Sequence, residues 1–314
     1  MQEHPTSRRG RRTFLGAAAG LALTGSLAPL AAARSSPEGV VRAAIRRARI
    51  PKSGELVPVI GLGTSRTFDE DPDAENPDLV AVMAGFLDWG GSLVDSSPMY
   101  KRAEAVVGAL CRTVGRSDLF YATKVWTKDG KAAGIAQMEK SAELMGTPRF
   151  DLMQVHNLVD LDVQLGTLKE WRASGRVRYI GVTEMRDFAK VEELVATGEL
   201  DFIQIPYSVR DRRVEERVLP ACIEHGVAAL VMQPYQSGRL FGAVKEKALP
   251  AWAADFGAAS WGQLFLKFIL GHDAVMLPIP ATSKPHHLDD NMAAGVGPAL
   301  DAAAREKLIG LLDG

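Results

Sequence analysis

Short apolar runs alternate with longer amphipathic stretches from residue 56 onward. Each run has four to six residues, which is the length of a buried strand. The stretches between the runs repeat their apolar residues every three to four positions, which predicts helices. The eight predicted strands are residues 57–61, 92–95, 119–124, 151–156, 179–183, 202–205, 228–232 and 274–279. This alternation favours a parallel sheet with helical crossovers.

The predicted helices are residues 79–89, 103–114, 135–145, 165–174, 188–196, 214–224, 261–270 and 287–294. Many of them end near a glycine that we expect to be a left-handed C-cap, namely Gly90, Gly115, Gly146, Gly175, Gly198, Gly226 and Gly271. Eight strand–helix units predict an α/β fold, a (β/α)8 TIM barrel in a single domain. A doubly wound sheet is the alternative, but residues 61–64 lack the third glycine of a dinucleotide-binding turn.

The first 33 residues differ from the rest of the chain. Four arginines between Arg8 and Arg12 stand against one acid, Glu3, and an uncharged run from residue 14 to residue 33 follows. This order is typical of an export signal, and small residues end the run where a peptidase would cut, after Ala33. A retained membrane anchor is the alternative, because twenty uncharged residues can span a bilayer, but large apolar side chains are few in this run.

Residues 11–15, Arg-Arg-Thr-Phe-Leu, resemble the twin-arginine export signal, whose pathway carries folded proteins. The resemblance implies that residues 1–33 engage the twin-arginine export machinery, and residues 34–314 remain for the predicted barrel. We therefore expect no stable membrane anchor and a periplasmic or other extracytoplasmic location.

Composition excludes several classes of protein. With 46% hydrophobic residues, 24% charged residues and two cysteines, the chain is neither disordered, collagen-like nor a disulfide scaffold. A formal net charge of −1 offers no basic field for a nucleic-acid backbone, so nucleic acid is an unexpected partner. Cys111 and Cys222 fall in helical stretches and are predicted to be buried thiols.

Reactive side chains fall at the ends of successive predicted strands. Asp95, Lys124, His156 and Thr183 close the second to fifth runs, and Tyr100 follows Asp95 on a short loop. The carboxyl ends of barrel strands converge on one mouth, where barrel enzymes place their catalytic groups. Any one of these residues alone has an ordinary structural explanation as a cap, a core histidine or an exposed amine. Together they predict a reactive site.

This set of side chains suits proton donation to a carbonyl oxygen. We expect the Lys124 ammonium to lower the pKa of the Tyr100 phenol, with Asp95 holding the ammonium in place. His156 would donate a hydrogen bond that orients the carbonyl group. A Schiff base on Lys124 is the rival chemistry, but it needs a desolvated lysine without a carboxylate partner. No spacing of Cys or His matches a metal site, and the serine nucleophile motif is missing.

These motifs resemble the aldo-keto reductases, a barrel family that transfers hydride from NADPH to aldehydes and ketones. The resemblance spans residues 56–296 and rests on Asp95 to Tyr100, on Lys124 within Ala-Thr-Lys-Val-Trp, and on His156 within Gln-Val-His-Asn. Glu104 and the entry segment ending in Thr64 also match. It implies a catalytic tetrad of Tyr100, Asp95, Lys124 and His156.

The resemblance also implies a set of cofactor contacts. Thr64, Thr183 and Gln204 would lie at the nicotinamide end, and two loops after the last strands would take the phosphates and adenosine. The expected residues in these loops are Ser237, Gly238, Leu240, Thr282, Ser283, Lys284, Asp290 and Asn291. Glu184, Met232 and Pro206 depart from the family pattern, and a carboxylate at Glu184 either turns away or accepts from the carboxamide nitrogen. Met99 and Trp126 are expected to line the substrate mouth.

The sequence therefore predicts an enzyme that reduces small-molecule aldehydes or ketones reversibly with NADPH, or with NADH as a possible substitute. The alternative is a nicotinamide-binding barrel with a sensory or regulatory role and little turnover.

Overall fold

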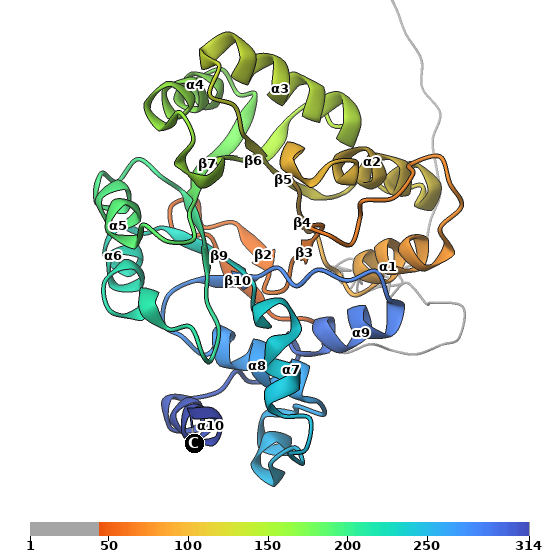
Figure 1. Cartoon of the computed structure of the whole chain (residues 1–314), viewed down its shortest axis with the longest axis vertical. Coiled ribbons are helices and arrows are strands. Elements are labelled where there is room, and N and C mark those ends of the chain that lie inside the picture. Colours follow the sequence, from red (N-terminus) through yellow and green to blue (C-terminus); the bar gives the residue numbers. More distant parts are fainter. Residues whose placement is uncertain (1–43, 314) are drawn as a thin grey trace, which may run out of the picture. The chain divides into compact units, whose positions relative to one another are not determined.

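A ring of parallel strands forms the centre of the chain, and helices surround it (Figure 1). The computed structural model describes residues 44–313. Eight strands pair in sequence order from β3 to β10. Gly63 of β3 also pairs in parallel with Ala281, just after β10, and its N–H donates to the carbonyl oxygen of Pro280 at 3.3 Å. These contacts join the two edges of the sheet, so the predicted (β/α)8 barrel is confirmed.

The barrel strands are β3 (Leu62–Gly63), β4 (Leu93–Asp95), β5 (Phe120–Val125), β6 (Phe150–Val155), β7 (Val177–Thr183), β8 (Phe202–Pro206), β9 (Ala228–Met232) and β10 (Met276–Pro278). The helices are α1 (Pro77–Asp88), α2 (Ala103–Val114), α3 (Gly130–Met145), α4 (Leu161–Ala173), α5 (Phe188–Ala196), α6 (Val218–His225), α7 (Arg239–Ala243), α8 (Trp261–Leu270), α9 (Pro285–Ala293) and α10 (Ala302–Asp313). Helices α7 and α10 were not expected from the sequence pattern.

The first predicted strand is wrong. Residues 56–58 form β2 (Leu56–Pro58), which pairs antiparallel with β1 (Arg47–Arg49) in a separate two-stranded sheet. Val57 of β2 and the neighbouring Ile50 pack against the apolar side chains that fill the barrel interior. The apolar run therefore reflects burial against one end of the barrel, and the first barrel strand begins only at Leu62.

Two further predictions about helices are corrected. The stretch at 214–224 becomes a 3₁₀ turn at Arg213–Glu215 followed by α6, because Pro220 lacks a backbone N–H and fits only in the first turn of a helix. Gly271 follows α8 with a φ of −89° and is not in the left-handed region. The other six predicted glycine caps have positive φ.

Successive side chains on a strand point to opposite faces of the sheet, and this alternation determines which residues reach the mouth of the barrel. Leu93, Phe120 and Ala122 point into the barrel interior, where they belong to the inner apolar cluster. Because side chains on a strand repeat every second residue, Asp95 and Lys124 continue these inward rows. The carboxyl ends of the strands therefore carry polar side chains above an apolar barrel core.

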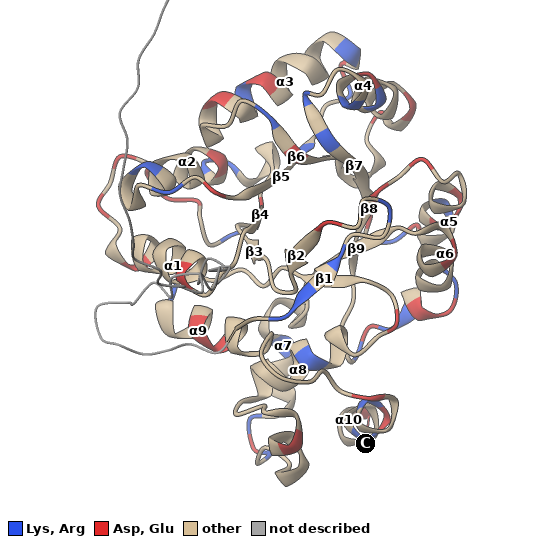
Figure 2. Ribbon diagram, turned by 180° about the vertical axis from the view of Figure 1, so that it is seen from behind, with Lys and Arg blue, Asp and Glu red and all other residues tan. Residues whose placement is uncertain are grey.

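Acidic and basic residues are interspersed on the outer helices (Figure 2). Cys111 and Cys222 are both buried and unpaired, as predicted. The expected signal at residues 1–33 lies outside the described residues. From residue 44 to residue 313, no helix combines the length and apolarity needed to cross a membrane.

Candidate active site

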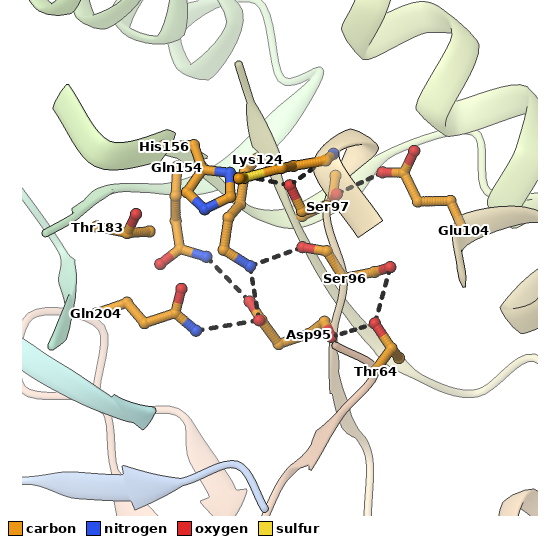
Figure 3. Close-up of polar contacts among 12 residues, drawn as sticks. Thr64, Asp95, Ser96, Ser97, Glu104, Lys124, Gln154, His156, Thr183 and Gln204 are labelled. Carbon is orange, nitrogen blue, oxygen red and sulfur yellow. Dashed lines mark hydrogen bonds and ion pairs between the residues drawn. The ribbon is translucent and has the colours of Figure 1, made fainter. Parts of the chain in front are cut away.

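A buried ion pair lies at the centre of the site. Lys124 Nζ donates to Asp95 Oδ2 at 2.6 Å and to the Ser96 carbonyl oxygen at 2.7 Å (Figure 3). The Asp95 carboxylate also accepts from Gln154 Nε2 at 3.2 Å and from Gln204 Nε2 at 3.0 Å. Lys124 is fully buried and Asp95 is 2% exposed. Several donors therefore surround the carboxylate, as a buried charge requires.

This pairing defines the charge of Lys124. Burial by itself lowers the pKa of the amine, but the Asp95 carboxylate and Tyr100 outweigh it, so the pKa of Lys124 is raised. The side chain is therefore an ammonium held by two oxygens. A Schiff base needs a neutral amine, and the Asp95 carboxylate keeps this buried lysine charged, so the geometry argues against that chemistry.

Tyr100 ends a short 3₁₀ turn, Pro98–Tyr100, directly after β4. The Ser97 hydroxyl caps this turn by accepting from the Met99 N–H at 3.1 Å. Lys124 Nζ lies 5.0 Å from the centroid of the Tyr100 ring. Burial raises the pKa of Tyr100, and the positive charge of Lys124 opposes this effect only in part. The expected lowering of the phenol pKa is therefore wrong, because desolvation exceeds the attraction of the ammonium.

His156 follows β6 and packs edge-on against Tyr100, with the ring centroids 5.9 Å apart. Its Nδ1 lies 3.0 Å from the Ser97 hydroxyl. Burial, and then the charge of Lys124, lower the pKa of His156 to about 3. The imidazole is therefore neutral at neutral pH and carries a single N–H.

Glu104 on α2 lies to one side of this group (Figure 3), where it contacts β5. Its carboxyl group accepts from the Thr123 hydroxyl at 2.5 Å and from the Ser141 hydroxyl at 3.1 Å. Burial raises the pKa of Glu104. Thr123 precedes Lys124 and points the other way along the strand, so these bonds connect α2 and α3 to the strand that carries Lys124.

A cavity of about 1180 Å³ opens above the ion pair. Asp95, Tyr100 and His156 line it, and it extends to the loops that follow β9 and β10. Of the predicted cofactor residues, Thr64, Gln204, Ser237, Gly238, Thr282, Asp290 and Asn291 lie on its wall. Thr183, Leu240, Ser283 and Lys284 do not line it, and neither does Lys124, which lies beneath Tyr100.

The cavity has the size and the donors to hold a dinucleotide. Its volume exceeds the roughly 300–1,000 Å³ typical of a small-ligand pocket. Gln204 lies on the wall beside Asp95, and Ser237 and Gly238 lie in the loop after β9. These residues fit a nicotinamide at one end and phosphates at the other, and their roles stay predictions.

The Glu184 side chain adopts one of the two orientations expected from the sequence, the one in which the carboxylate turns away from the cofactor. Its Oε1 accepts from the backbone N–H groups of Met185, Arg186 and Asp187 at 2.7, 2.8 and 3.4 Å. The carboxylate therefore turns to its own loop and away from the cavity. Thr183 is buried, and its hydroxyl accepts from the Asn157 N–H at 3.0 Å.

Two expected adenosine contacts have partners within the protein. Tyr235 donates to Asn291 Oδ1 at 2.6 Å, and Asp290 accepts from Ser260 at 2.8 Å. Lys284 Nζ donates to Asp78 Oδ2 at 2.8 Å, with both side chains about half exposed. A phosphate contact from Lys284 would require it to leave Asp78.

Only one of the two residues expected to line the substrate mouth lies on the cavity wall. Met99 lines the cavity and is 44% exposed, whereas Trp126 is exposed but lies off the cavity wall. Met185 and Phe241 also line it and were not predicted, because both lie on loops or short helices without strand periodicity. Gln154 and Ser97 were also not predicted as site residues, although Gln154 lies two residues before His156 and so on the same, inward face of β6.

Within residues 44–313, no cluster of His, Cys, Asp and Glu is arranged to hold a metal ion.

Comparison with known proteins identifies the family. The model of the aldo/keto reductase family matches residues 59–307. An NADH-specific methylglyoxal reductase of Escherichia coli is 27% identical over 191 residues, which cover 52% of this chain and 58% of that protein. The chain thus spans little more than half the length of that relative. The aldo-keto reductase yakc of Schizosaccharomyces pombe, whose name specifies NADP(+), is 25% identical over 299 residues, or 80% and 88% of the two chains.

A solved structure shows the same fold. An aldo-keto reductase from Klebsiella pneumoniae in complex with NADPH superposes with a TM-score of 0.72 at 25% identity, and the match covers 85% of this chain and 95% of that one.

Proposed function

This chain belongs to the aldo/keto reductase family, and on that premise we propose that it reduces small aldehydes or ketones to alcohols with NADPH, or with NADH as a substitute. The observation that carries the proposal is the buried Lys124–Asp95 pair, which lies beneath Tyr100 and His156 at the wall of the large cavity. The relatives named for NADH and NADP(+), and the neighbour solved with NADPH, support the choice of cofactors.

The residues of the chain would act together on a carbonyl group. Tyr100 keeps its proton because burial raises its pKa, so it is the proton donor to the carbonyl oxygen. Lys124 stabilises the phenolate that remains after this transfer, and Asp95 holds the ammonium. His156 orients the carbonyl through its N–H. Gln204, Ser237, Gly238 and Thr282 line the cavity and would hold a nicotinamide dinucleotide, which would supply the hydride when bound.

The test is NADPH oxidation by the full chain in the presence of a reactive aromatic aldehyde. We expect Tyr100→Phe to lose turnover by about 100-fold or more and to keep cofactor binding, because general-acid catalysis contributes about 10²–10⁴-fold. Cofactor binding is measured separately by quenching of protein fluorescence. Full turnover by Tyr100→Phe would contradict the proposal. NADPH binding without turnover in the wild-type protein would support the sensory alternative.

The proposal extends to the first 33 residues, which we assign to twin-arginine export. The order of arginines, uncharged run and small residues supports this assignment. We expect the protein to reach the periplasm of a bacterial host, and an Arg11→Lys, Arg12→Lys variant to stay in the cytoplasm. Fractionation of cells followed by immunoblotting measures this, and equal export of both proteins would exclude the assignment.

A further inference from the structure

The Ser97 side chain connects the two residues that face the carbonyl group. It is fully buried and lies between the end of β4 and the turn that carries Tyr100. Its hydroxyl oxygen accepts from the Met99 N–H at 3.1 Å and lies 3.0 Å from Nδ1 of His156 (Figure 3). The hydroxyl therefore has one partner on the turn of Tyr100 and one on the imidazole ring.

A neutral imidazole has one N–H, so the contact with Ser97 has two possible directions. If Nδ1 carried the hydrogen, the Ser97 oxygen would accept from both Nδ1 and Met99. The hydroxyl hydrogen would then have no acceptor among the described residues, although the side chain is buried. If the hydroxyl donates to Nδ1, the Ser97 hydroxyl, His156 Nδ1 and the Met99 N–H all have a hydrogen-bond partner. Buried donors are rarely left without an acceptor, so the second direction is favoured.

We infer that Ser97 is a positioning residue that holds His156 in the tautomer with hydrogen on Nε2. With Nδ1 engaged as an acceptor, Nε2–H is the remaining donor of the ring, and His156 lines the cavity beside Tyr100. The same hydroxyl caps the turn of Tyr100, so a single side chain positions both hydrogen-bond donors, the Tyr100 hydroxyl and the Nε2–H of His156. The inference deepens the proposed reduction and rests on it.

The first test is the tautomer of His156 in the full-length protein, measured by ¹⁵N NMR with labelled histidine and assigned with His156→Gln. We expect the wild-type ring to carry its hydrogen on Nε2. In Ser97→Ala we expect a mixture of tautomers, because Nδ1 loses its donor. Ser97→Thr keeps the hydroxyl and is expected to restore the wild-type tautomer. Hydrogen on Nδ1 in the wild-type protein overturns the inference, whatever the variants do.

The second test is kinetic. We expect Ser97→Ala to lower kcat/KM for aldehyde reduction by about 10- to 100-fold, the usual effect of losing a residue that orients a functional histidine, and to leave the affinity for NADPH unchanged. Ser97→Thr should recover most of the rate. An unchanged rate and tautomer in Ser97→Ala would also overturn the inference.

Ser141→Ala is the matched control, because Ser141 is an equally buried serine whose hydroxyl serves Glu104 rather than His156. We expect it to keep the wild-type tautomer, so a general effect of losing a buried hydroxyl is separated from the effect at His156. The NMR measurement needs no substrate. A wild-type protein without turnover would therefore contradict the proposed function and still report the tautomer, whereas turnover with a tautomer independent of Ser97 would contradict only the inference.

Discussion

Lys124 and Asp95 form an ion pair of 2.6 Å with both side chains excluded from solvent. Removing one partner of a buried pair leaves a charge without compensation, at a cost of about 3–5 kcal/mol. We expect Asp95→Asn to lower the free energy of unfolding by about this amount, because the Lys124 ammonium then keeps only the Ser96 carbonyl and a neutral amide. Urea denaturation measures the change.

The exposed pair Lys131–Glu170 provides the control for this prediction. Its side chains are 50% and 62% exposed, and such surface pairs contribute about 0–1 kcal/mol. We expect Glu170→Gln to change the free energy of unfolding by less than about 1 kcal/mol. Equal effects of Asp95→Asn and Glu170→Gln would mean that the buried pair contributes no more than a surface one.

We expect the buried His156 to lower the stability of the folded protein in acid. The pKa of His156 is about 3 in the folded protein, against 6.5 for an ordinary histidine. As pH falls below 6.5, the unfolded chain takes up a proton that the folded chain does not bind, so the free energy of unfolding decreases until the pH nears 3. At about pH 5 the expected loss relative to neutral pH is about 2 kcal/mol.

The measurement compares urea unfolding at about pH 7.5 and about pH 5 for the wild-type protein and His156→Gln. The variant should lose less stability than the wild-type protein over this range, because it has no ring to protonate. His286→Gln, at an exposed histidine, is the control and should follow the wild-type protein. Identical pH dependence in His156→Gln and the wild-type protein would refute the effect.

The raised pKa of Tyr100 predicts the pH above which aldehyde reduction slows. Because burial raises the pKa of the phenol above 10 against the charge of Lys124, Tyr100 stays protonated through neutral and mildly basic pH. We expect kcat for aldehyde reduction to be level up to about pH 9 and to fall only above about pH 10. Stopped-flow measurement of NADPH oxidation across this range checks the profile. A decline centred near pH 8 would show that the ammonium lowers the phenol pKa after all.

Lys284 is expected to influence the choice between NADPH and NADH. Its pair with Asp78 is half exposed, so separating it costs about 1 kcal/mol or less. We expect Asp78→Asn to free Lys284 for the 2′-phosphate and to lower KM for NADPH by up to about 5-fold. KM for NADH should not change. Lys284→Ala should raise KM for NADPH alone, and equal changes for both cofactors would exclude a contact with the 2′-phosphate.

The sequence predicts the barrel and most of the candidate site for a common physical reason. Side chains alternate along a strand, and parallel strands end at one mouth, so the sequence alone places Asp95, Lys124 and His156 together. The Lys124–Asp95 bond in the structure agrees with that placement.

What the sequence could not predict depends on packing between distant segments. The apolar residues of β2 have the pattern of a barrel strand, and only their burial against the barrel end distinguishes them. The pKa of Tyr100 depends on how strongly its ring is desolvated, which no spacing reveals. Lys284 was expected at a phosphate, but Asp78 lies 206 residues earlier in the chain and becomes its partner only in the fold.

Gly108 shows how closely α2 and α3 approach each other. A Cβ at this position would overlap the carbonyl oxygen of Leu144, and backbone cannot move aside as a flexible side chain does. We expect Gly108→Ala to lower the free energy of unfolding by about 1–3 kcal/mol or more, since overpacking forces the two helices apart. Because Glu104 on α2 holds Thr123 beside Lys124, activity should fall as well.

Gly310→Ala on α10 is the control, since Gly310 faces open space and alanine there should stabilise the helix by about 0.5–1 kcal/mol. Equal stability of the two variants would contradict the close approach of α2 and α3.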